Sequence, residues 1–230
     1  MSKKVIHLAF VLLAMLCGLS LHAAEVIDRI VATVNGQVIL QSDVDEAISY
    51  QAFADGRPLN LVSAADRKAA LDRLIDQELI RQEVHASDFQ PVPGAEVEAR
   101  IADIRKLHPE ATDDASWTSA LHRYGLSAGE LREKVAADLN SWKAVEARLR
   151  PDVAINSGSV ERYYHENLLP ALHKTGAPAP ALVEVAPKIK EILTQQQINN
   201  LLAIWLKSLR NESRIEIAYV AGVASQGGSY

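Results

Sequence analysis

The stretch that decides the fold is Ile30-Val31-Ala32-Thr33-Val34-Asn35-Gly36-Gln37-Val38-Ile39-Leu40. Two apolar runs, Val31–Val34 and Gln37–Leu40, flank an Asn-Gly pair. Asparagine and glycine tolerate the positive φ angles of a type I′ turn, so this pattern predicts a tight β-hairpin. Both faces of the hairpin are largely apolar, which predicts that the rest of the protein covers it on both sides.

Most of the chain from Ser42 to Arg210 has the apolar periodicity of α-helices. Ser42 is the expected N-cap of the helix after the hairpin, and Ser63 opens a longer helix. The most regular helix follows the capping box of Ser127 and Glu130. A final long helix is expected to begin near Pro187, because proline is tolerated in a first turn.

Alternating apolar and polar residues from Arg214 to Val220 predict a C-terminal strand. An isolated hairpin is marginal in water and a lone strand has no partner, so we expect the two to pair. The predicted fold class is therefore mainly α: a helical core with a small antiparallel sheet formed by the N-terminal hairpin and the C-terminal strand. Residues 221–230, rich in glycine and serine, are expected to be a disordered tail.

The N-terminus has the pattern of a secretory signal peptide. Lys3 and Lys4 precede a short apolar run, and Ala23 and Ala24 stand before Glu25. We expect residues 1–24 to be removed after Ala24, with Ala23 as a near alternative, which predicts a periplasmic location. An uncleaved membrane anchor is the alternative, although the apolar run is short for a spanning helix.

The composition after such cleavage excludes several classes of function. Cys17 would leave with the signal peptide, so the mature chain would have no cysteine for disulfides, thiol catalysis or thiolate metal sites. Loss of two lysines changes the formal charge from −5 to −7, and the chain lacks a basic cluster, which argues against nucleic acid as a partner. A hydrophobic content of 48% is that of a globular protein.

The hairpin also carries a family resemblance, which extends over the run Val26–Asp45. This run resembles the mature start of SurA-type periplasmic chaperones. A second likeness is to the family's N-domain, in the run Ser127-x-x-Glu130-Leu131-Arg132-Glu133. A third is to the family's C-terminal segment, in Trp205-Leu206-x-x-Leu209-Arg210 followed by Ile215-Glu216-Ile217.

The resemblance implies a chaperone core made of N-terminal helices and a C-terminal helix and strand, with parvulin-type prolyl isomerase domains inserted between them. The insertion would follow Tyr164, but segment 165–186 is too short for a parvulin domain and lacks its Gly-rich motifs. The expected organisation is a SurA N-domain-like helical core over 25–155 and a helix with a Pro-containing connector over 156–186. A C-terminal helix and strand over 187–220 would complete the core.

No catalytic or metal site is expected from the sequence, and no cofactor. The mature histidines are scattered, mostly on predicted polar faces, and have no carboxylate at metal-ligand spacing; they are His85, His108, His122, His165 and His173. Acidic and basic residues alternate along the helices, as they do on solvated faces. The chain is therefore predicted not to be an enzyme.

The large aromatic residues are the candidate client-binding residues: Trp117, Trp142, Tyr163, Tyr164 and Trp205. An amphipathic ring on a groove wall holds an apolar side chain well. The competing interpretation places the tryptophans in the core. Likewise, the hairpin either only anchors the C-terminal strand or also accepts an extended peptide at its free edge.

We therefore expect a periplasmic holdase that binds unfolded or partly folded envelope proteins, including outer-membrane proteins. Two alternatives remain open: a non-catalytic structural or assembly subunit, including a homodimer, and a degenerate prolyl isomerase. Aggregation assays, mass in solution and peptide isomerisation assays distinguish the three.

Overall fold

The computed structural model describes residues 28–84 and 90–218. The expected signal peptide and C-terminal tail lie outside the described residues, as do the last two residues of the predicted C-terminal strand. The elements are, in chain order, β1 (Ile30–Val34), β2 (Gln37–Leu40), α2 (Gln41–Ala54), α3 (Ala64–Glu83), α4 (Gly94–Arg105), α5 (Asp114–Arg123), α6 (Ala128–Leu149), α7 (Ser157–Tyr163), α8 (Leu169–Thr175), α9 (Leu182–Glu212) and β3 (Ile215–Ile217). The chain is thus mainly helical, as predicted.

The hairpin is built on the turn that the sequence indicates. Asn35 and Gly36 have φ angles of 51° and 88°, which are the positive values of a type I′ turn. The Asn35 side chain also joins three elements, because its Nδ2 donates to Gln82 Oε1 on α3 (2.7 Å) and its Oδ1 accepts from the Arg214 amide (2.8 Å). One turn residue therefore fixes both the hairpin and the approach of the C-terminal strand.

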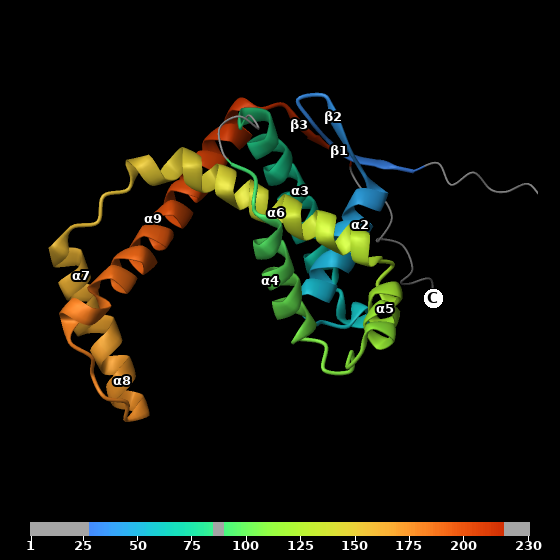
Figure 1. The fold of residues 1–230 in the computed structure, drawn as a ribbon. Helices are drawn as coiled ribbons and strands as arrows, with labels where there is room; N and C mark the ends of the chain where they lie inside the picture. Colours follow the sequence, from blue (N-terminus) through green and yellow to red (C-terminus); the bar gives the residue numbers. More distant parts are fainter. Residues whose placement is uncertain (1–27, 85–89, 219–230) are drawn as a thin grey trace, which may run out of the picture.

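The two ends of the described chain meet in one three-stranded sheet of order β2-β1-β3. β1 lies in the middle and is antiparallel to both neighbours. Figure 1 shows β3, drawn in red, beside the blue hairpin. The predicted pairing of the hairpin with the C-terminal strand is confirmed.

One face of the sheet is covered and the other only in part, at Val31, so the predicted cover on both sides is incomplete. Ala32 and Val34 are fully buried, whereas Ile30 and Val38 are each 48% exposed. A bulge between Ile30 and Ala32 shifts the register, and Val31 is buried as well. Apolar side chains on both faces did not require two covers, because β-branched residues also occupy exposed strand positions.

Three buried clusters hold the helices together. The sheet packs on α2, α3 and the end of α9 through a cluster that includes Ile75 and Leu79. A second cluster, centred on Phe53, joins α2, α4, α5 and α6. A third joins the ends of α3 and α6 to α9 and is formed by Ile80, Val145, Leu149 and Ile198. We call the sheet, the helices α2 to α6 and the C-terminal half of α9 the body.

An arm extends from the body in Figure 1; it consists of α7, the π-helical turn Tyr164–Leu168, α8 and the N-terminal half of α9. α9 begins at Leu182 and not near Pro187, which lies inside the helix. Proline leaves the carbonyl four residues earlier without a helical partner. That residue is Val183, which is 80% exposed, so water can satisfy its carbonyl group.

The N-terminus of α3 is closed by the predicted serine cap. The Ser63 hydroxyl accepts from the Asp66 amide, and the Asp66 carboxylate accepts from the Ser63 amide at 2.8 Å. The Ser63 hydroxyl also donates to the Asp66 carboxylate at 2.6 Å. This bond is the largest cause that lowers the pKa of Asp66 to about 2, followed by the bond from the Ser63 amide and the contact with Arg57. The first helix is different: α2 begins at Gln41, where the Asp43 carboxylate accepts from the Leu40 amide, and Ser42 instead donates to Asp28.

Replacing Ser63 by alanine should lower the free energy of unfolding by about 1 kcal/mol at pH 7, as for other N-cap losses. The pKa of Asp66 is depressed on folding, so its stabilising contribution is complete above its ordinary value of 3.8 and is lost as the pH falls through about 2. Urea unfolding at pH 7 and pH 3 should therefore show a smaller cost of Ser63→Ala at pH 3. Ser157→Ala is the control, because Ser157 also begins a helix but Asn156 is its cap. Equal losses for both variants would contradict the capping role.

Candidate functional site

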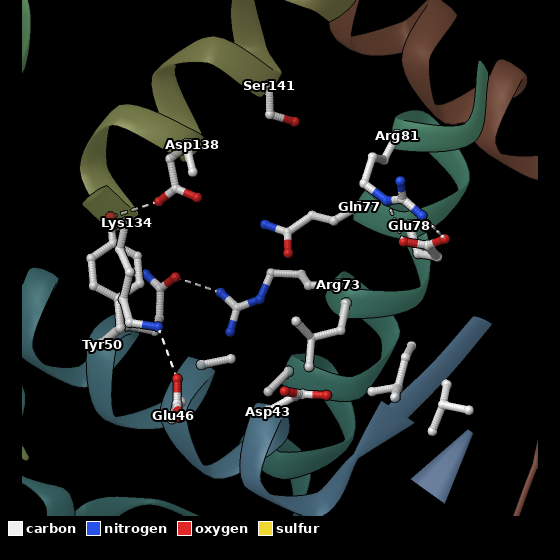
Figure 2. Close-up of a pocket in the computed structure, with 17 residues that line it drawn as sticks. Asp43, Glu46, Tyr50, Arg73, Gln77, Glu78, Arg81, Lys134, Asp138 and Ser141 are labelled. Carbon is white, nitrogen blue, oxygen red and sulfur yellow. Dashed lines mark hydrogen bonds and ion pairs between the residues drawn. The ribbon is translucent and has the colours of Figure 1, made fainter. Parts of the chain in front are cut away.

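A cleft of about 560 Å³ opens between α2, α3 and α6, next to β2. Figure 2 shows α6 and α2 on one side of the cleft and α3 on the opposite side. Its volume lies within the range of ligand-binding pockets in proteins. The cleft is thus large enough to receive part of another molecule.

Each helix contributes polar residues at helical spacing, so that successive side chains point into the cleft. In Figure 2 they project from three directions. The groups are Asp43, Glu46 and Tyr50 on α2; Arg73, Gln77 and Arg81 on α3; and Lys134, Asp138 and Ser141 on α6. Gln51 and Glu78 also line the cleft, and small or apolar residues complete the lining, namely Val38, Ile39, Ala47, Ala70, Leu74 and Ala137.

Two polar contacts join α2 to α6 across the cleft. The Tyr50 hydroxyl donates to Asp138 at 2.6 Å, and Lys134 lies 3.2 Å from Glu46. Burial raises the pKa of the Tyr50 hydroxyl, and its contact with the Asp138 carboxylate raises this pKa further. Desolvation by the cleft walls likewise raises the pKa of Asp138, against the lowering effects of the Tyr50 hydroxyl and Arg73. The phenol therefore stays protonated at neutral pH and remains the donor.

Most of the other charges in the cleft are satisfied within the protein. Arg81 forms an ion pair with Glu78 at 2.7 Å, and Arg73 donates to the Gln51 side chain at 2.6 Å. The side chains of Gln77 and Ser141, in contrast, have no hydrogen bond within the described residues, although they face the same space from α3 and α6. The cleft thus offers neutral hydrogen-bonding groups beside small apolar side chains, which suits an uncharged polar chain better than an isolated ion.

None of the five aromatic candidates lines this cleft. Trp117 is only 8% exposed and packs against Phe53, so its position favours the core interpretation. Trp142 and Trp205 are half-buried and both pack against the third cluster. Tyr163 and Tyr164 lie in the arm, where the Tyr164 hydroxyl donates to the Pro180 carbonyl at 2.8 Å.

Sequence reasoning missed the residues that do line the cleft, including Tyr50, Arg73, Gln77 and Asp138. A signal was present, because Arg73, Gln77 and Arg81 repeat every four residues beside an apolar stripe. On its own such a repeat is typical of a solvated helix face. Only the convergence of three helices makes it the wall of a cleft.

The arm has a second hollow of about 510 Å³ between α7 and the start of α9. Its apolar lining includes Val160, Leu182 and Val183. Within residues 28–84 and 90–218, no cluster of three or more His, Cys, Asp or Glu residues is placed to hold a metal ion. In the same part of the chain, no helix combines the length and apolarity needed to cross a membrane.

A helical body closed by a sheet of its two ends, with an arm and an open cleft, agrees with the family resemblance of the sequence. The model of the SurA-like N-terminal domain family matches residues 2–144, more than half of the chain, and the protein therefore belongs to this family. Segment 165–186 forms most of the π-helical turn, α8 and the start of α9, so a parvulin domain does not occupy it.

Two curated relatives, both named Chaperone SurA, are similar to the chain. The protein of Aliivibrio fischeri is 28% identical over 153 residues, which cover 65% of this chain and 34% of that protein. The protein of Chromohalobacter salexigens is 24% identical over 194 residues, which cover 83% of this chain and 43% of that protein. The chain spans less than half the length of these relatives.

Proposed function

We propose that the protein is a periplasmic chaperone that holds unfolded envelope proteins, outer-membrane proteins among them, without catalysing a reaction. Membership of the SurA-like family, the name of the two relatives and the signal-peptide pattern of residues 1–24 support this proposal. Unfolded proteins aggregate through exposed apolar surface, and a holdase works by covering that surface transiently.

We propose the cleft between α2, α3 and α6 as the main client-binding site. The observation that carries this assignment is its lining, in which the Gln77 amide and the Ser141 hydroxyl, which have no partner among residues 28–84 and 90–218, adjoin small apolar residues. An extended polypeptide presents amide groups and apolar side chains in the same alternation. The half-buried aromatic residues outside the cleft, Trp142, Tyr163, Tyr164 and Trp205, form a second contact surface in this proposal.

The domain organisation follows the same proposal. In it, residues 25–155 and 187–220 belong to the chaperone core, although the first part of 187–220 lies in the arm, and 156–186 replaces the isomerase domain that the family resemblance implies. Unfolded polypeptides are the partners, and no nucleic acid or cofactor takes part.

The test is suppression of aggregation by the protein purified after export. A urea-unfolded outer-membrane protein is diluted into buffer with increasing amounts of the chaperone, and turbidity is recorded. Suppression that scales with stoichiometry is expected. Unchanged aggregation at molar excess would contradict the proposed function, and a peptide isomerisation rate above background would favour a degenerate isomerase instead.

Filling the cleft should weaken client binding while the fold is retained. Ala137 lines the cleft on α6, whereas Ala147 lies on the same helix and lines a different surface hollow. Ala137→Trp is expected to weaken binding of a fluorescent client about tenfold, equivalent to about 1.4 kcal/mol. Ala147→Trp should bind as the original protein does. Equal affinities of the two variants, at equal melting temperatures, would place the client elsewhere.

The arm favours a second candidate function, that of an assembly subunit or homodimer. Val160 and Ile189 are buried in the arm, but Val183 is 80% exposed and the tyrosines are only half-buried. Apolar surface of this kind is typical of interfaces. Light scattering over a range of concentrations decides: a fixed dimer mass without client supports this candidate, and a monomer mass excludes the homodimer.

A further inference from the structure

We infer that the outer edge of β2 pairs with the main chain of an extended client segment whose continuation lies in the cleft. This inference rests on the proposed function and names how the client is recognised: by its peptide groups. An extended chain added to a sheet edge gains main-chain hydrogen bonds that do not depend on its sequence.

The hydrogen bonds of β1 determine which groups of β2 are free. Toward β3, the Asn35 amide donates to the Arg214 carbonyl and the Ala218 amide donates to the Val31 carbonyl, both at 2.9 Å. Successive residues of a strand direct their main-chain groups to opposite sides. The residues of β1 that alternate with these, Ala32 and Val34, therefore direct theirs to β2.

Val38 is consequently the residue of β2 whose main-chain groups point outward. Val38 pairs with Thr33, and the main-chain groups of Thr33 point toward β3 and not toward β2. The Val38 amide and carbonyl therefore have no ladder partner on β1. Within residues 28–84 and 90–218 no loop, turn or side-chain hydrogen bond reaches them either, and Val38 is 48% exposed. The next outward amide, that of Leu40, already donates to Asp43 at 2.8 Å. The free edge thus offers one donor and one acceptor, the pair that one residue of an added strand uses.

The free edge continues directly into the cleft. Val38 and Ile39 line the same cavity as Gln77 and Ser141. A chain that pairs with Val38 therefore passes between α3 and α6, where these two side chains supply further hydrogen bonds to peptide groups. Arg81 is paired with Glu78 and Lys134 with Glu46. Asp43, Arg73 and Asp138 are hydrogen-bonded to neutral groups, so the charged side chains of the lining are already engaged within the protein. This arrangement fits a chaperone that accepts many unrelated segments.

Three variants test the edge. Val38→Pro removes the outward amide and leaves the ladder to β1 intact, as proline does at strand edges. Val38→Ala removes side-chain contact but keeps the amide. Ile217→Pro removes an outward amide at the opposite edge, because Ile217 pairs with Ala32 in β3. Relative to Val38→Ala, Val38→Pro is expected to bind an unfolded client about fivefold more weakly, the effect of one hydrogen bond of about 1 kcal/mol. Ile217→Pro should bind normally.

A second measurement uses the unchanged protein, so a misfolded variant cannot decide the result. An apolar decapeptide that binds the protein is made with main-chain N-methyl groups on two adjacent central residues, which blocks both of its edges. The matched peptide has the same groups two residues apart, which leaves one edge whole. The first peptide should lose binding and the second should keep it.

The outcomes separate the two proposals. Absence of client binding by the unchanged protein would remove the proposed function itself. Normal binding with equal affinities for Val38→Pro and Val38→Ala, and for the two methylated peptides, would overturn edge pairing alone. A change of mass in solution caused by Val38→Pro without any change in client affinity would assign the edge to a second copy of the chain and also overturn the inference.

Discussion

Replacing Phe53 by alanine is expected to lower the free energy of unfolding by about 3–5 kcal/mol, the range for large aromatic side chains removed from a core. Phe53 has no exposed surface. Its ring stacks on His108 at 4.2 Å between centroids and lies 5.2 Å from both Trp117 and Tyr124. Urea unfolding followed by circular dichroism measures the loss.

The size of this effect follows from the position of Phe53 between helices. Its carbonyl accepts a hydrogen bond from Nε2 of the buried His108 at 2.8 Å, so Phe53 joins α2 to the loop before α5 through both its ring and its main chain. The cavity left by Phe53→Ala would remove contacts between the helices that pack together in the second buried cluster. Leu61→Ala is the control, because Leu61 is 65% exposed and should change stability by no more than about 0.5 kcal/mol. Similar losses for both variants would mean that the aromatic cluster does not hold the body together.

Ending the chain after Arg210 is expected to lower the free energy of unfolding by about 4 kcal/mol, at about 1 kcal/mol for each main-chain hydrogen bond that Val31, Asn35 and both groups of Thr33 lose. The truncation removes the β3 partners of Val31, Thr33 and Asn35. Ala32 and Val34, which have no exposed surface, would then stand at an open sheet edge. The midpoint of urea unfolding measures the change.

A truncation after Ala218 separates loss of the strand from loss of the tail. This variant keeps β3 and its hydrogen bonds and lacks only residues outside the described structure. It should unfold at the same urea concentration as the full chain. An equal effect of both truncations, or none from either, would show that the hairpin does not need its third strand.

The local features of this fold could be predicted because single residues and near neighbours decide them. The Asn35-Gly36 turn depends on two φ angles that few other residues adopt. The Ser127–Glu130 capping box needs residues only three positions apart, and its Ser127 amide donates to Glu130 at 2.7 Å. Pairing of β3 with the hairpin was also predictable, because neither element is stable alone.

The errors occurred where distant parts of the chain decide between equivalent local patterns. The sequence indicated two apolar hairpin faces, but the face opposite Ala32 and Val34 is covered only in part. It did not distinguish the three tryptophans on apolar stripes, of which Trp117 is buried against Phe53 whereas Trp142 and Trp205 are half-exposed. A helix pattern reports which side is apolar and not how much of that side a neighbour covers.

By itself, the sequence determined the type of most main elements, the hairpin turn and the serine caps of α3 and α6, and the family to which the chain belongs. It did not predict α8, which lies in the expected connector. The tertiary structure alone decided the cleft. Tyr50 and Asp138 are far apart in the chain and acquire their 2.6 Å hydrogen bond only because α2 and α6 both pack against α3. Neither residue carries a local signal of that contact, since the free energy that brings them together comes from burial of the apolar faces on the other sides of their helices.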